Sequence, residues 1–217
     1  MLTFIGIGPG DKELLTLKAV RIIREADAIA FADTGMGSSA VSAILDDLLR
    51  DKPLFPLEIP MKGKREDWLA AHVRAADRLL ELLESHPSIA YPVLGDPGIY
   101  ASSSYLKRLV EKKHPCSVVP GITTMCAAAA AAGIALCEQG ESLTILDRFE
   151  PETSLPEGNA VIMKGGRKLA ALKRAAAGRE AWAVRNLGME NEWSGPLADI
   201  PEEDYSYFTT IIVKKQG

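Results

Sequence analysis

The sequence has few aromatic residues, few histidines and cysteines, and no excess of positive charge. Aromatic residues make up 6% of the 217 residues, and 29 acidic residues outnumber 25 basic residues, which gives a net charge of −4. A protein that holds nucleic acid through its phosphates needs a basic surface. The composition therefore argues against a nucleic-acid partner.

Cysteines and histidines do not form the patterns of a disulfide framework or a metal centre. The cysteines are Cys116, Cys126 and Cys137, and the histidines are His72, His86 and His114. An odd number of cysteines without Cys-x-x-Cys spacing favours free thiols, so we expect a cytoplasmic protein. The histidines are far apart and close to charged segments. We expect each of them at the surface or at a helix end, and predict no metal site.

Long apolar runs are also missing. The N-terminus lacks a basic region followed by an apolar one, so no targeting segment is predicted. The longest uncharged stretch is 115–137, but Pro120-Gly121 and Gly133 interrupt it, and its centre is the alanine run 127–132. Alanine gives little transfer free energy per residue, so we expect a buried, closely packed helix there and no membrane partner.

Short apolar runs alternate with segments of helical spacing along the whole chain. Residues 2–7 and 28–32 are typical of buried strands, and the stretch between them has helical spacing. This βαβ unit should have parallel strands and a right-handed crossover. The clearest helix is 68–84, whose apolar positions step by four and three residues, and these are Leu69, Val73, Ala76, Leu80 and Leu83. The alternation predicts an α/β protein with mostly parallel or mixed sheets.

The remaining predicted elements divide at Pro120-Gly121. Further strands are expected near 54–59, 88–94, 116–119, 142–146, 160–163, 181–184 and 207–213, and further helices near 41–49, 99–112, 122–132 and 169–177. Strand–helix alternation occurs on both sides of Pro120-Gly121. We therefore predict two α/β domains, residues 1–119 and 120–217.

Three glycine- or proline-rich loops follow predicted strands, where open α/β sheets bind ligands. The first loop is Gly6-Ile-Gly-Pro-Gly-Asp11, whose glycines allow a sharp turn and the close approach of a ligand. It is not a P-loop, because no Gly-Lys-Ser/Thr follows. Asp11 also stands where a dinucleotide-binding Gly-x-Gly-x-x-Gly has its third glycine. Asp11 is suited to cap the helix that follows.

The second and third loops offer polar groups. The second loop is Gly95-Asp-Pro-Gly-Ile-Tyr100, in which Asp96 can accept hydrogen bonds from ribose hydroxyls or simply cap a turn. The third loop is Pro120-Gly-Ile-Thr-Thr124, which opens the alanine-rich helix. Thr123 and Thr124 can cap that helix, or hold a carboxylate or an adenosine at its N-terminus.

In this order the three loops resemble the tetrapyrrole methylase family, whose members transfer methyl groups from S-adenosylmethionine (SAM). The resemblance covers the whole chain and includes residues 14–19 and 161–164. It implies two α/β domains with the cofactor in a cleft between them, usually in a homodimer. Within the family, residues 59–61, 95–106, 133–143 and 207–213 resemble precorrin-2 C(20)-methyltransferase or its cobalt-factor II counterpart.

The resemblance carries SAM contacts onto eight positions. These positions are Pro9, Gly95, Asp96, Ile99, Thr123, Thr124, Met163 and Leu187. Leu187 departs from the family, which often has glycine near this position. Phe31-Ala-Asp-Thr34 stands where relatives often carry Tyr-Pro, and the region 51–64 is short. The last two departures concern the substrate side more than the cofactor.

The implied reaction is an in-line displacement that moves a methyl group to carbon 20 of precorrin-2 or cobalt-factor II, in cobalamin biosynthesis. For such a step the enzyme mainly supplies proximity and orientation. A proton then leaves the methylated carbon, and the candidates for its acceptor are Asp33, Tyr100, Tyr105 and Glu141, with none assigned. The tetrapyrrole substrate carries many carboxylates, so an acidic protein needs a local basic rim. The candidates for this rim are Lys12, Lys62, Lys64, Arg65 and Lys107.

Other functions remain open at this point. Another tetrapyrrole methylase would act at a different ring carbon, and a diphthine synthase or ribosomal RNA methylase would share the family, although the latter would want a more basic surface. An NAD-binding oxidoreductase would use Gly6 to Gly10 as its phosphate loop and Asp33 on a ribose. The missing third glycine counts against it. A non-catalytic nucleotide-binding module is the fourth alternative.

Overall fold

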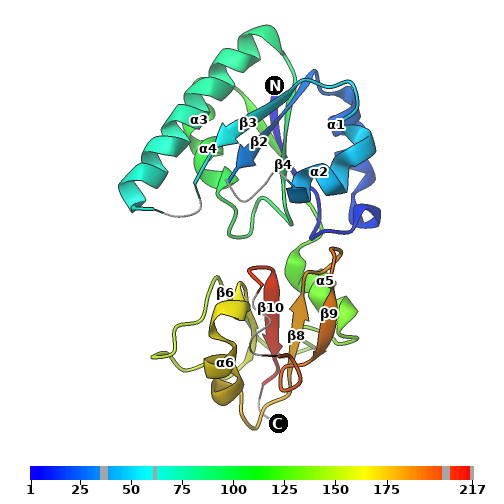
Figure 1. Ribbon diagram of the computed structural model, residues 1–217, viewed down its shortest axis with the longest axis vertical. Helices are drawn as coiled ribbons and strands as arrows, with labels where there is room; N and C mark the ends of the chain where they lie inside the picture. The colour runs from blue at the N-terminus through cyan, green and yellow to red at the C-terminus, as the bar shows by residue number, and fades with distance from the viewer. Residues whose placement is uncertain (35–38, 61–62, 202–205, 216–217) are drawn as a thin grey trace. The chain divides into compact units, whose positions relative to one another are not determined.

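The computed structural model describes residues 1–34, 39–60, 63–201 and 206–215. The chain forms two compact units, residues 1–123 and 124–217, and each contains one five-stranded sheet (Figure 1). In the part of the chain that the structure covers, no helix is long and apolar enough to cross a membrane.

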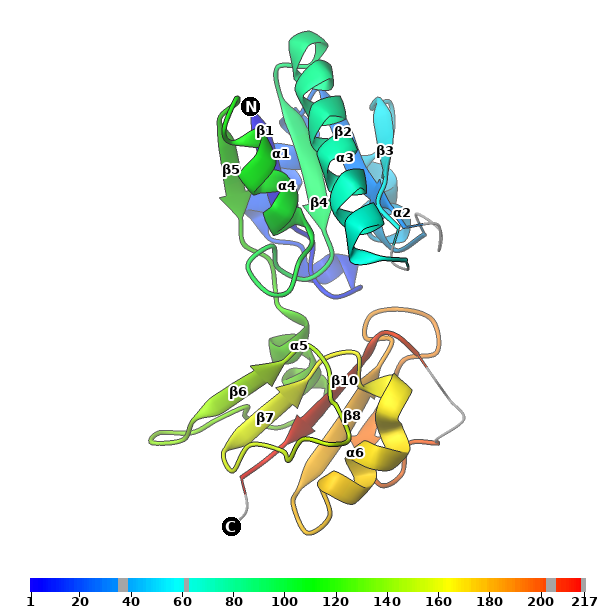
Figure 2. The ribbon, with the colours of Figure 1, turned by 90° about the vertical axis from the view of Figure 1, so that its left-hand side faces the viewer.

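The sheet of the N-terminal unit is parallel throughout and has the order β3-β2-β4-β1-β5 (Figure 2). Its strands are β1 (Leu2–Gly6), β2 (Ala28–Asp33), β3 (Leu54–Glu58), β4 (Ile89–Val93) and β5 (Cys116–Val119). The two strands of the predicted βαβ unit are parallel, but β4 lies between them. Strand β1 is buried at every residue, which explains its unbroken apolar sequence.

Helices cover both faces of this sheet. On one face lie α1 (Leu17–Glu25) and α2 (Ser39–Leu45), and on the other lie α3 (Arg65–Ser85) and α4 (Ser103–Val110) (Figure 2). Thr16 caps α1 by accepting a hydrogen bond from the Ala19 N–H at 3.1 Å. Asp11 accepts one from the Glu13 N–H at 2.8 Å, so it caps the short 3-10 helix that precedes α1, Lys12–Leu14. A second short 3-10 helix, Asp46–Leu48, follows α2.

The buried face of α3 differs from the predicted one. It consists of Ala71, His72, Ala75, Ala76, Leu79, Leu82 and Leu83. Leu69 and Val73 remain 41% and 49% exposed, so their assignment to the apolar face was wrong. Three alanines let the helix axis approach the sheet closely, and this small-residue face is less conspicuous in the sequence than the leucines beside it.

The helix expected over 99–112 is shorter than predicted. Tyr100 adopts a left-handed backbone conformation with a φ of 47°, and α4 begins only at Ser103. A left-handed residue cannot be part of a right-handed helix, so the second loop extends to Ser102. This extension places more backbone at the carboxyl edge of the sheet.

The C-terminal unit has a mixed sheet with the order β6-β7-β10-β8-β9. Its strands are β6 (Leu143–Leu146), β7 (Asn159–Ile162), β8 (Ala181–Arg185), β9 (Trp193–Pro196) and β10 (Thr209–Val213). Strands β6 and β7 pair in parallel, and the other pairings are antiparallel. Strand β9 was not predicted, because Trp-Ser-Gly-Pro shows no apolar alternation.

Helices α5 (Thr124–Ala131) and α6 (Leu169–Ala175) belong to the C-terminal unit, and the 3-10 helix Gly165–Lys168 leads into α6. The helix α5 buries Met125, Ala127, Ala128 and Ala129, which confirms the buried alanine-rich helix. The apolar cluster of this unit joins α6 to β7, β8 and β10.

Candidate functional site

The first and second loops are joined by a pair of backbone hydrogen bonds. The Gly8 N–H donates to the Gly95 carbonyl at 3.3 Å, and the Gly95 N–H donates to the Gly8 carbonyl at 2.7 Å. Both glycines are left-handed, with φ values of 75° and 72°, which other residues rarely adopt. This bridge fixes the buried Pro9 and Gly95 beyond the carboxyl ends of β1 and β4.

Asp96 ties the second loop to the third. Its Oδ2 accepts a hydrogen bond from the Gly121 N–H at 2.8 Å, and its Oδ1 accepts one from the Gly98 N–H at 2.7 Å. A carboxylate oxygen has two acceptor sites, so each oxygen still has capacity for a ligand hydroxyl. Asp96 is therefore part of the loop framework and remains able to bind a ribose.

Gly6, Gly95 and Gly121 form a glycine junction in which backbone packs on backbone. A Cβ on Gly6 would lie 2.4 Å from the Gly121 nitrogen, and a Cβ on Gly121 would lie 2.3 Å from the Gly95 carbonyl oxygen. Side chains are excluded at these distances. The three loops are consequently packed backbone to backbone at the carboxyl edge of the sheet, where open α/β sheets bind ligands.

Five of the eight predicted SAM positions fall on these joined loops of the N-terminal unit. They are Pro9, Gly95, Asp96, Ile99 and Thr123. The Ile99 N–H donates to the Asp96 carbonyl at 3.2 Å, so Ile99 is held by the same turn. Thr123 is half-buried and ends the unit, because the contacts of Gly121 attach the third loop to the N-terminal sheet.

The other three predicted positions lie in the C-terminal unit. Thr124 is the first residue of α5, whereas Met163 follows β7 and Leu187 follows β8. Strands β7 and β8 flank β10 and run in the same direction, so Met163 and Leu187 lie at the same end of that sheet. The Met163 N–H donates to the Leu146 carbonyl at 2.8 Å, which fixes its backbone.

Two residues next to these positions have an uncommon backbone conformation. Positive φ values among the described non-glycine residues occur at Asp51, Tyr100, Lys164, Asn186 and Asn191. Aspartate and asparagine tolerate this region, but a tyrosine or a lysine rarely adopts it, at a cost of about 1–3 kcal/mol. Tyr100 follows Ile99 and Lys164 follows Met163. Strained backbone of this kind clusters at functional sites.

His72 is buried, and the surface position expected for it was wrong. It is 1% exposed and packs against Trp68 with the two rings tilted by 45° and their centroids 3.9 Å apart. Its Nδ1 lies 2.8 Å from the Trp68 carbonyl, which can only accept, so we assign the hydrogen to Nδ1. Nε2 has no partner among the described residues, and burial lowers the pKa of the ring. No sequence signal pointed to this burial, because the apolar spacing favoured Leu69 and Val73 on α3 instead of His72.

Glu141, a candidate proton acceptor, is committed to structural hydrogen bonds. Its carboxylate accepts from the Glu138 N–H at 2.9 Å, from the Asn159 amide at 2.7 Å, and from the ammonium groups of Lys215 and Lys214 at 3.0 and 3.3 Å. The Glu138 bond, with the others, lowers the pKa of Glu141 to about 2. A base of this pKa accepts protons poorly at neutral pH.

The other candidates for acid–base work and for the basic rim come from several elements of the N-terminal unit. Asp33 ends β2 at the carboxyl edge, and Tyr100 and Tyr105 are 55% and 36% exposed. Lys64 and Arg65 stand at the start of α3, Lys12 is in the 3-10 helix before α1, and Lys107 is paired with Glu111. Lys62 lies outside the described residues.

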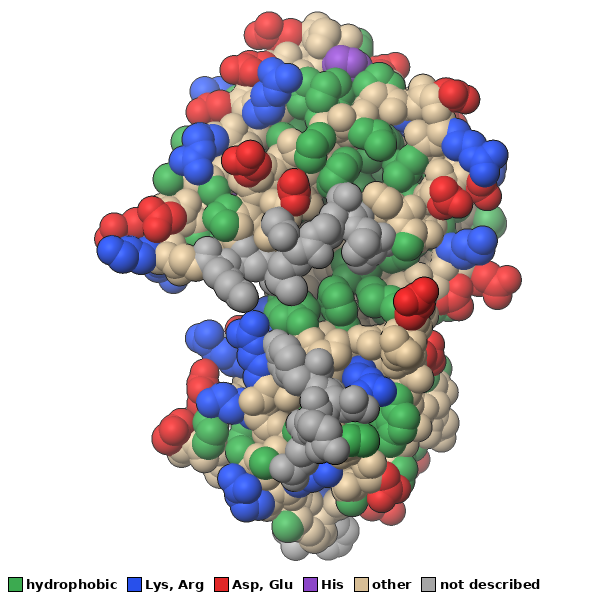
Figure 3. Space-filling model, viewed as in Figure 1, with side chains coloured by type: hydrophobic (Ala, Val, Ile, Leu, Met, Phe, Trp, Pro, Cys, Tyr) green, Lys and Arg blue, Asp and Glu red, His purple; other side chains and the backbone are tan. Residues whose placement is uncertain are grey.

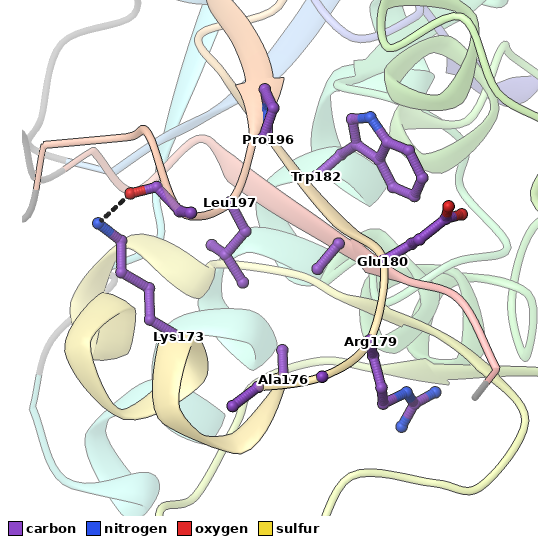
Figure 4. Close-up of a pocket in the computed structure, with 11 residues that line it drawn as sticks. Lys173, Ala176, Arg179, Glu180, Trp182, Pro196 and Leu197 are labelled. Atoms are coloured by element: carbon purple, nitrogen blue, oxygen red, sulfur yellow. Dashed lines mark hydrogen bonds between the residues drawn. The ribbon is translucent and has the colours of Figure 1, made fainter. Parts of the chain in front are cut away.

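A pocket of about 520 Å³ lies elsewhere in the C-terminal unit, between the end of α6 and strands β8 and β9 (Figure 4). The ammonium of Lys173 donates to the Ala198 and Ile200 carbonyls at 3.0 and 2.7 Å, and the Arg179 guanidinium donates to the carbonyls of Pro156, Gly158 and Lys214. These cations stabilise the surrounding chain. The pocket adjoins the beginning of β8, at the opposite end of the strand from Leu187, and none of the eight predicted positions lines it.

A parallel sheet with glycine-rich loops joined beyond its carboxyl edge is the arrangement at which open α/β proteins bind ligands. More particularly, the chain belongs to the tetrapyrrole (corrin/porphyrin) methylases, whose family model matches residues 1–201. It is a methyltransferase, and the predicted family and α/β class are both confirmed.

Individual relatives agree with this assignment. The chain is 31% identical to the precorrin-2 C(20)-methyltransferase of a Sinorhizobium species, over 96% of this chain and 93% of the relative. It is 26% identical to the cobalt-precorrin-2 C(20)-methyltransferase of Salmonella typhimurium, over 98% and 95%. Among solved structures, the cobalamin synthesis related protein CobF of Corynebacterium diphtheriae has a TM-score of 0.79 at 24% identity, over 100% and 99% of the two chains, which supports the fold.

Proposed function

We propose that the chain transfers a methyl group from SAM to carbon 20 of precorrin-2 or cobalt-factor II, in cobalamin biosynthesis. The observation that carries this proposal is the identity of 31% to a precorrin-2 C(20)-methyltransferase over nearly the whole of both chains. The joined loops at the carboxyl edge of the N-terminal sheet support a cofactor site there. A homodimer and a cytoplasmic location are part of the proposal, on the family resemblance and on the odd number of cysteines without Cys-x-x-Cys spacing.

The glycine junction fits an adenosine better than it fits a diphosphate. Its backbone is bare because any Cβ would collide with the neighbouring loop, and Asp96 keeps acceptor capacity that suits ribose hydroxyls. A carboxylate beside a diphosphate would repel it. This difference favours SAM over NAD as the ligand of the loops.

We propose the eight positions as the SAM-contacting residues. Asp96 accepts from the ribose, while Gly95 and Pro9 present backbone and a flat apolar surface, and Ile99 packs on the adenine. Thr123 and Thr124 supply hydroxyls at the start of α5, and Met163 and Leu187 supply apolar contacts from the C-terminal unit. SAM supplies an activated methyl group, and the side chains orient the acceptor carbon.

The test combines binding and turnover. Calorimetric titration should give binding of SAM and no binding of NAD. Incubation with a labelled methyl donor should place the label on carbon 20 of the tetrapyrrole, as determined by mass spectrometry and NMR. Parallel reactions with precorrin-2 and cobalt-factor II decide which of them is the substrate. A label on another ring carbon would favour a different methylase of this family, and binding of NAD without SAM would overturn the proposal.

The assembly and the contact positions need measurements of their own. Light scattering of the purified protein should give twice the mass of the 23.4-kDa chain. Ile99→Ala and Met163→Ala should each weaken SAM binding, because each substitution removes apolar contact with the cofactor. A monomer, or unchanged SAM affinity in both variants, would contradict these parts of the proposal.

A further inference from the structure

Lys164 is held in a left-handed conformation at the end of β7 by the tight turn that follows it. Its φ and ψ are 56° and 30°. The next two residues are buried glycines: a Cβ on Gly165 would lie 2.5 Å from Ile211 Cγ1, and a Cβ on Gly166 would lie 2.3 Å from the Ser206 carbonyl oxygen. The turn is thus pressed against β10 and the residues before it. The backbone of Lys164 has little freedom to relax.

The Tyr207 ring positions the Lys164 ammonium group, but no acidic side chain among the described residues neutralises its charge. Its ammonium lies 5.6 Å from the centroid of the Tyr207 ring, and Tyr207 in turn packs edge-on against Phe208 at 5.3 Å. An aromatic face attracts a cation without cancelling its charge. Among the side chains that the structure describes, no carboxylate forms an ion pair with Lys164. Figure 3 shows Lys and Arg side chains spread over one face of the C-terminal unit.

Glycine or asparagine would satisfy this backbone position with less strain, so the turn itself does not explain a lysine. The position directly follows Met163, one of the proposed SAM contacts. An ammonium group has three donors and binds carboxylates and phosphates. The ligands of the proposed reaction carry carboxylates and no phosphate.

We propose that Lys164 is the binding residue for a carboxylate of a bound ligand, either the amino-acid carboxylate of SAM or a side-chain carboxylate of the tetrapyrrole. The inference rests on the proposed function and specifies how the C-terminal unit contributes to it. It also supplies a cation for a polyanionic substrate on a protein of net charge −4. Lys107, in contrast, is already paired with Glu111.

The decisive variant is Lys164→Asn, because asparagine tolerates the left-handed conformation and carries no charge. Lys164→Arg retains the charge, and Lys168→Asn makes the same charge change at an exposed neighbouring lysine. Binding is measured by calorimetry with SAM and with decarboxylated SAM, and by fluorescence quenching with uroporphyrin III, a stable polycarboxylate tetrapyrrole. These binding measurements do not depend on methyl transfer.

We expect Lys164→Asn to keep or raise the melting temperature and to weaken one carboxylate ligand by roughly tenfold or more. Loss of affinity for SAM but not for decarboxylated SAM assigns the cofactor carboxylate, whereas loss for uroporphyrin III alone assigns the tetrapyrrole carboxylate. Lys164→Arg should retain most of the affinity, and Lys168→Asn should match the wild type. Unchanged affinity of Lys164→Asn for both SAM and uroporphyrin III would overturn the inference. A wild-type protein that binds these ligands without transferring methyl would contradict the proposed function instead.

Discussion

The Asp96 carboxylate accepts a hydrogen bond from the backbone N–H of Gly121, 25 residues further along the chain, at 2.8 Å. The same carboxylate accepts from the Gly98 N–H, so one side chain shapes its own loop and holds the next one. The Asp96 side chain therefore holds the loop that should bind the ribose against the loop that leads into α5.

Asp96→Asn should loosen this connection. The amide keeps one acceptor oxygen but turns an NH₂ group toward one of the two backbone donors, so one hydrogen bond is lost and that donor is left unpaired. We expect a loss of about 1–3 kcal/mol in the free energy of unfolding, with weaker SAM binding. Denaturant unfolding and calorimetry measure the two effects. Glu25→Gln, which breaks only an exposed pair with Arg21, should change neither by more than about 0.5 kcal/mol.

Gly121→Ala should separate the third loop from the first two. The added Cβ would lie 2.3 Å from the Gly95 carbonyl oxygen and 2.7 Å from the Gly6 carbonyl carbon, so the backbone must move. Overpacking of this kind costs about 1–3 kcal/mol, and SAM affinity should fall with it. Gly178→Ala is the matched control. It should also lower the stability, because alanine is strained at the φ of 79° that Gly178 adopts. Its added Cβ, however, has no neighbouring atom within 4 Å, and it lies in the C-terminal unit. Equal SAM affinities in the two variants would contradict a binding role for the glycine junction.

Ionised Glu141 should stabilise the C-terminal unit at pH values above the pKa of its carboxyl group. Hydrogen bonds lower the pKa of Glu141 to about 2, below the usual value near 4.3. The ionised form is favoured by folding, so this contribution is complete above the unfolded pKa and is lost as the pH falls toward 2. Glu141→Gln should lower the melting temperature at pH 7, and the difference from the wild type should narrow between pH 4.5 and pH 2. A difference that does not vary with pH would point to packing instead of charge.

His72 should make the N-terminal unit sensitive to mild acid. Because burial lowers its pKa, the unfolded state binds the proton more readily, and stability declines as the pH falls below about 6.5. His72→Leu removes both this proton site and the unpartnered Nε2, so its melting temperature should decline less than that of the wild type between pH 7 and pH 5. His114→Gln, outside the core, should leave the decline unchanged. Parallel declines in wild type and His72→Leu would show that His72 does not carry the effect.

Apolar runs and glycine spacing were sufficient to predict most strands and the loops at their ends. The run 2–7 contains β1 and the run 28–32 covers β2 except for its last residue, Asp33, since buried parallel strands have continuous apolar sequences. The sequence did not show which strands and loops are neighbours. The bridge between Gly8 and Gly95 and the bond from Gly121 to Asp96 depend on which strands are neighbours, and the order β4-β1-β5 is a property of the whole sheet.

The wrong or missing sequence predictions also concern contacts between segments that are distant in the sequence. The burial of His72 and the exposure of Val73 both follow from an α3 face whose first half contains three alanines, and alanine carries a weak apolar signal. Strand β9 is held by β8 at the sheet edge although its own sequence has low strand propensity. The left-handed conformation of Lys164 is set by the close packing of Gly165 on Ile211 of β10 and of Gly166 on Ser206, and these contacts join segments at least 40 residues apart.

The place of β10 has a consequence for the order in which the chain folds. This strand is the last along the described chain, yet it lies at the centre of its sheet, between β7 and β8. During synthesis the N-terminal sheet can close as soon as β5 has emerged from the ribosome, whereas β6–β7 and β8–β9 remain two unjoined pairs until residues 209–213 arrive. The nascent C-terminal unit therefore exposes the strand edges of β7 and β8 until β10 has been synthesised, and these edges are binding sites for chaperones during that interval.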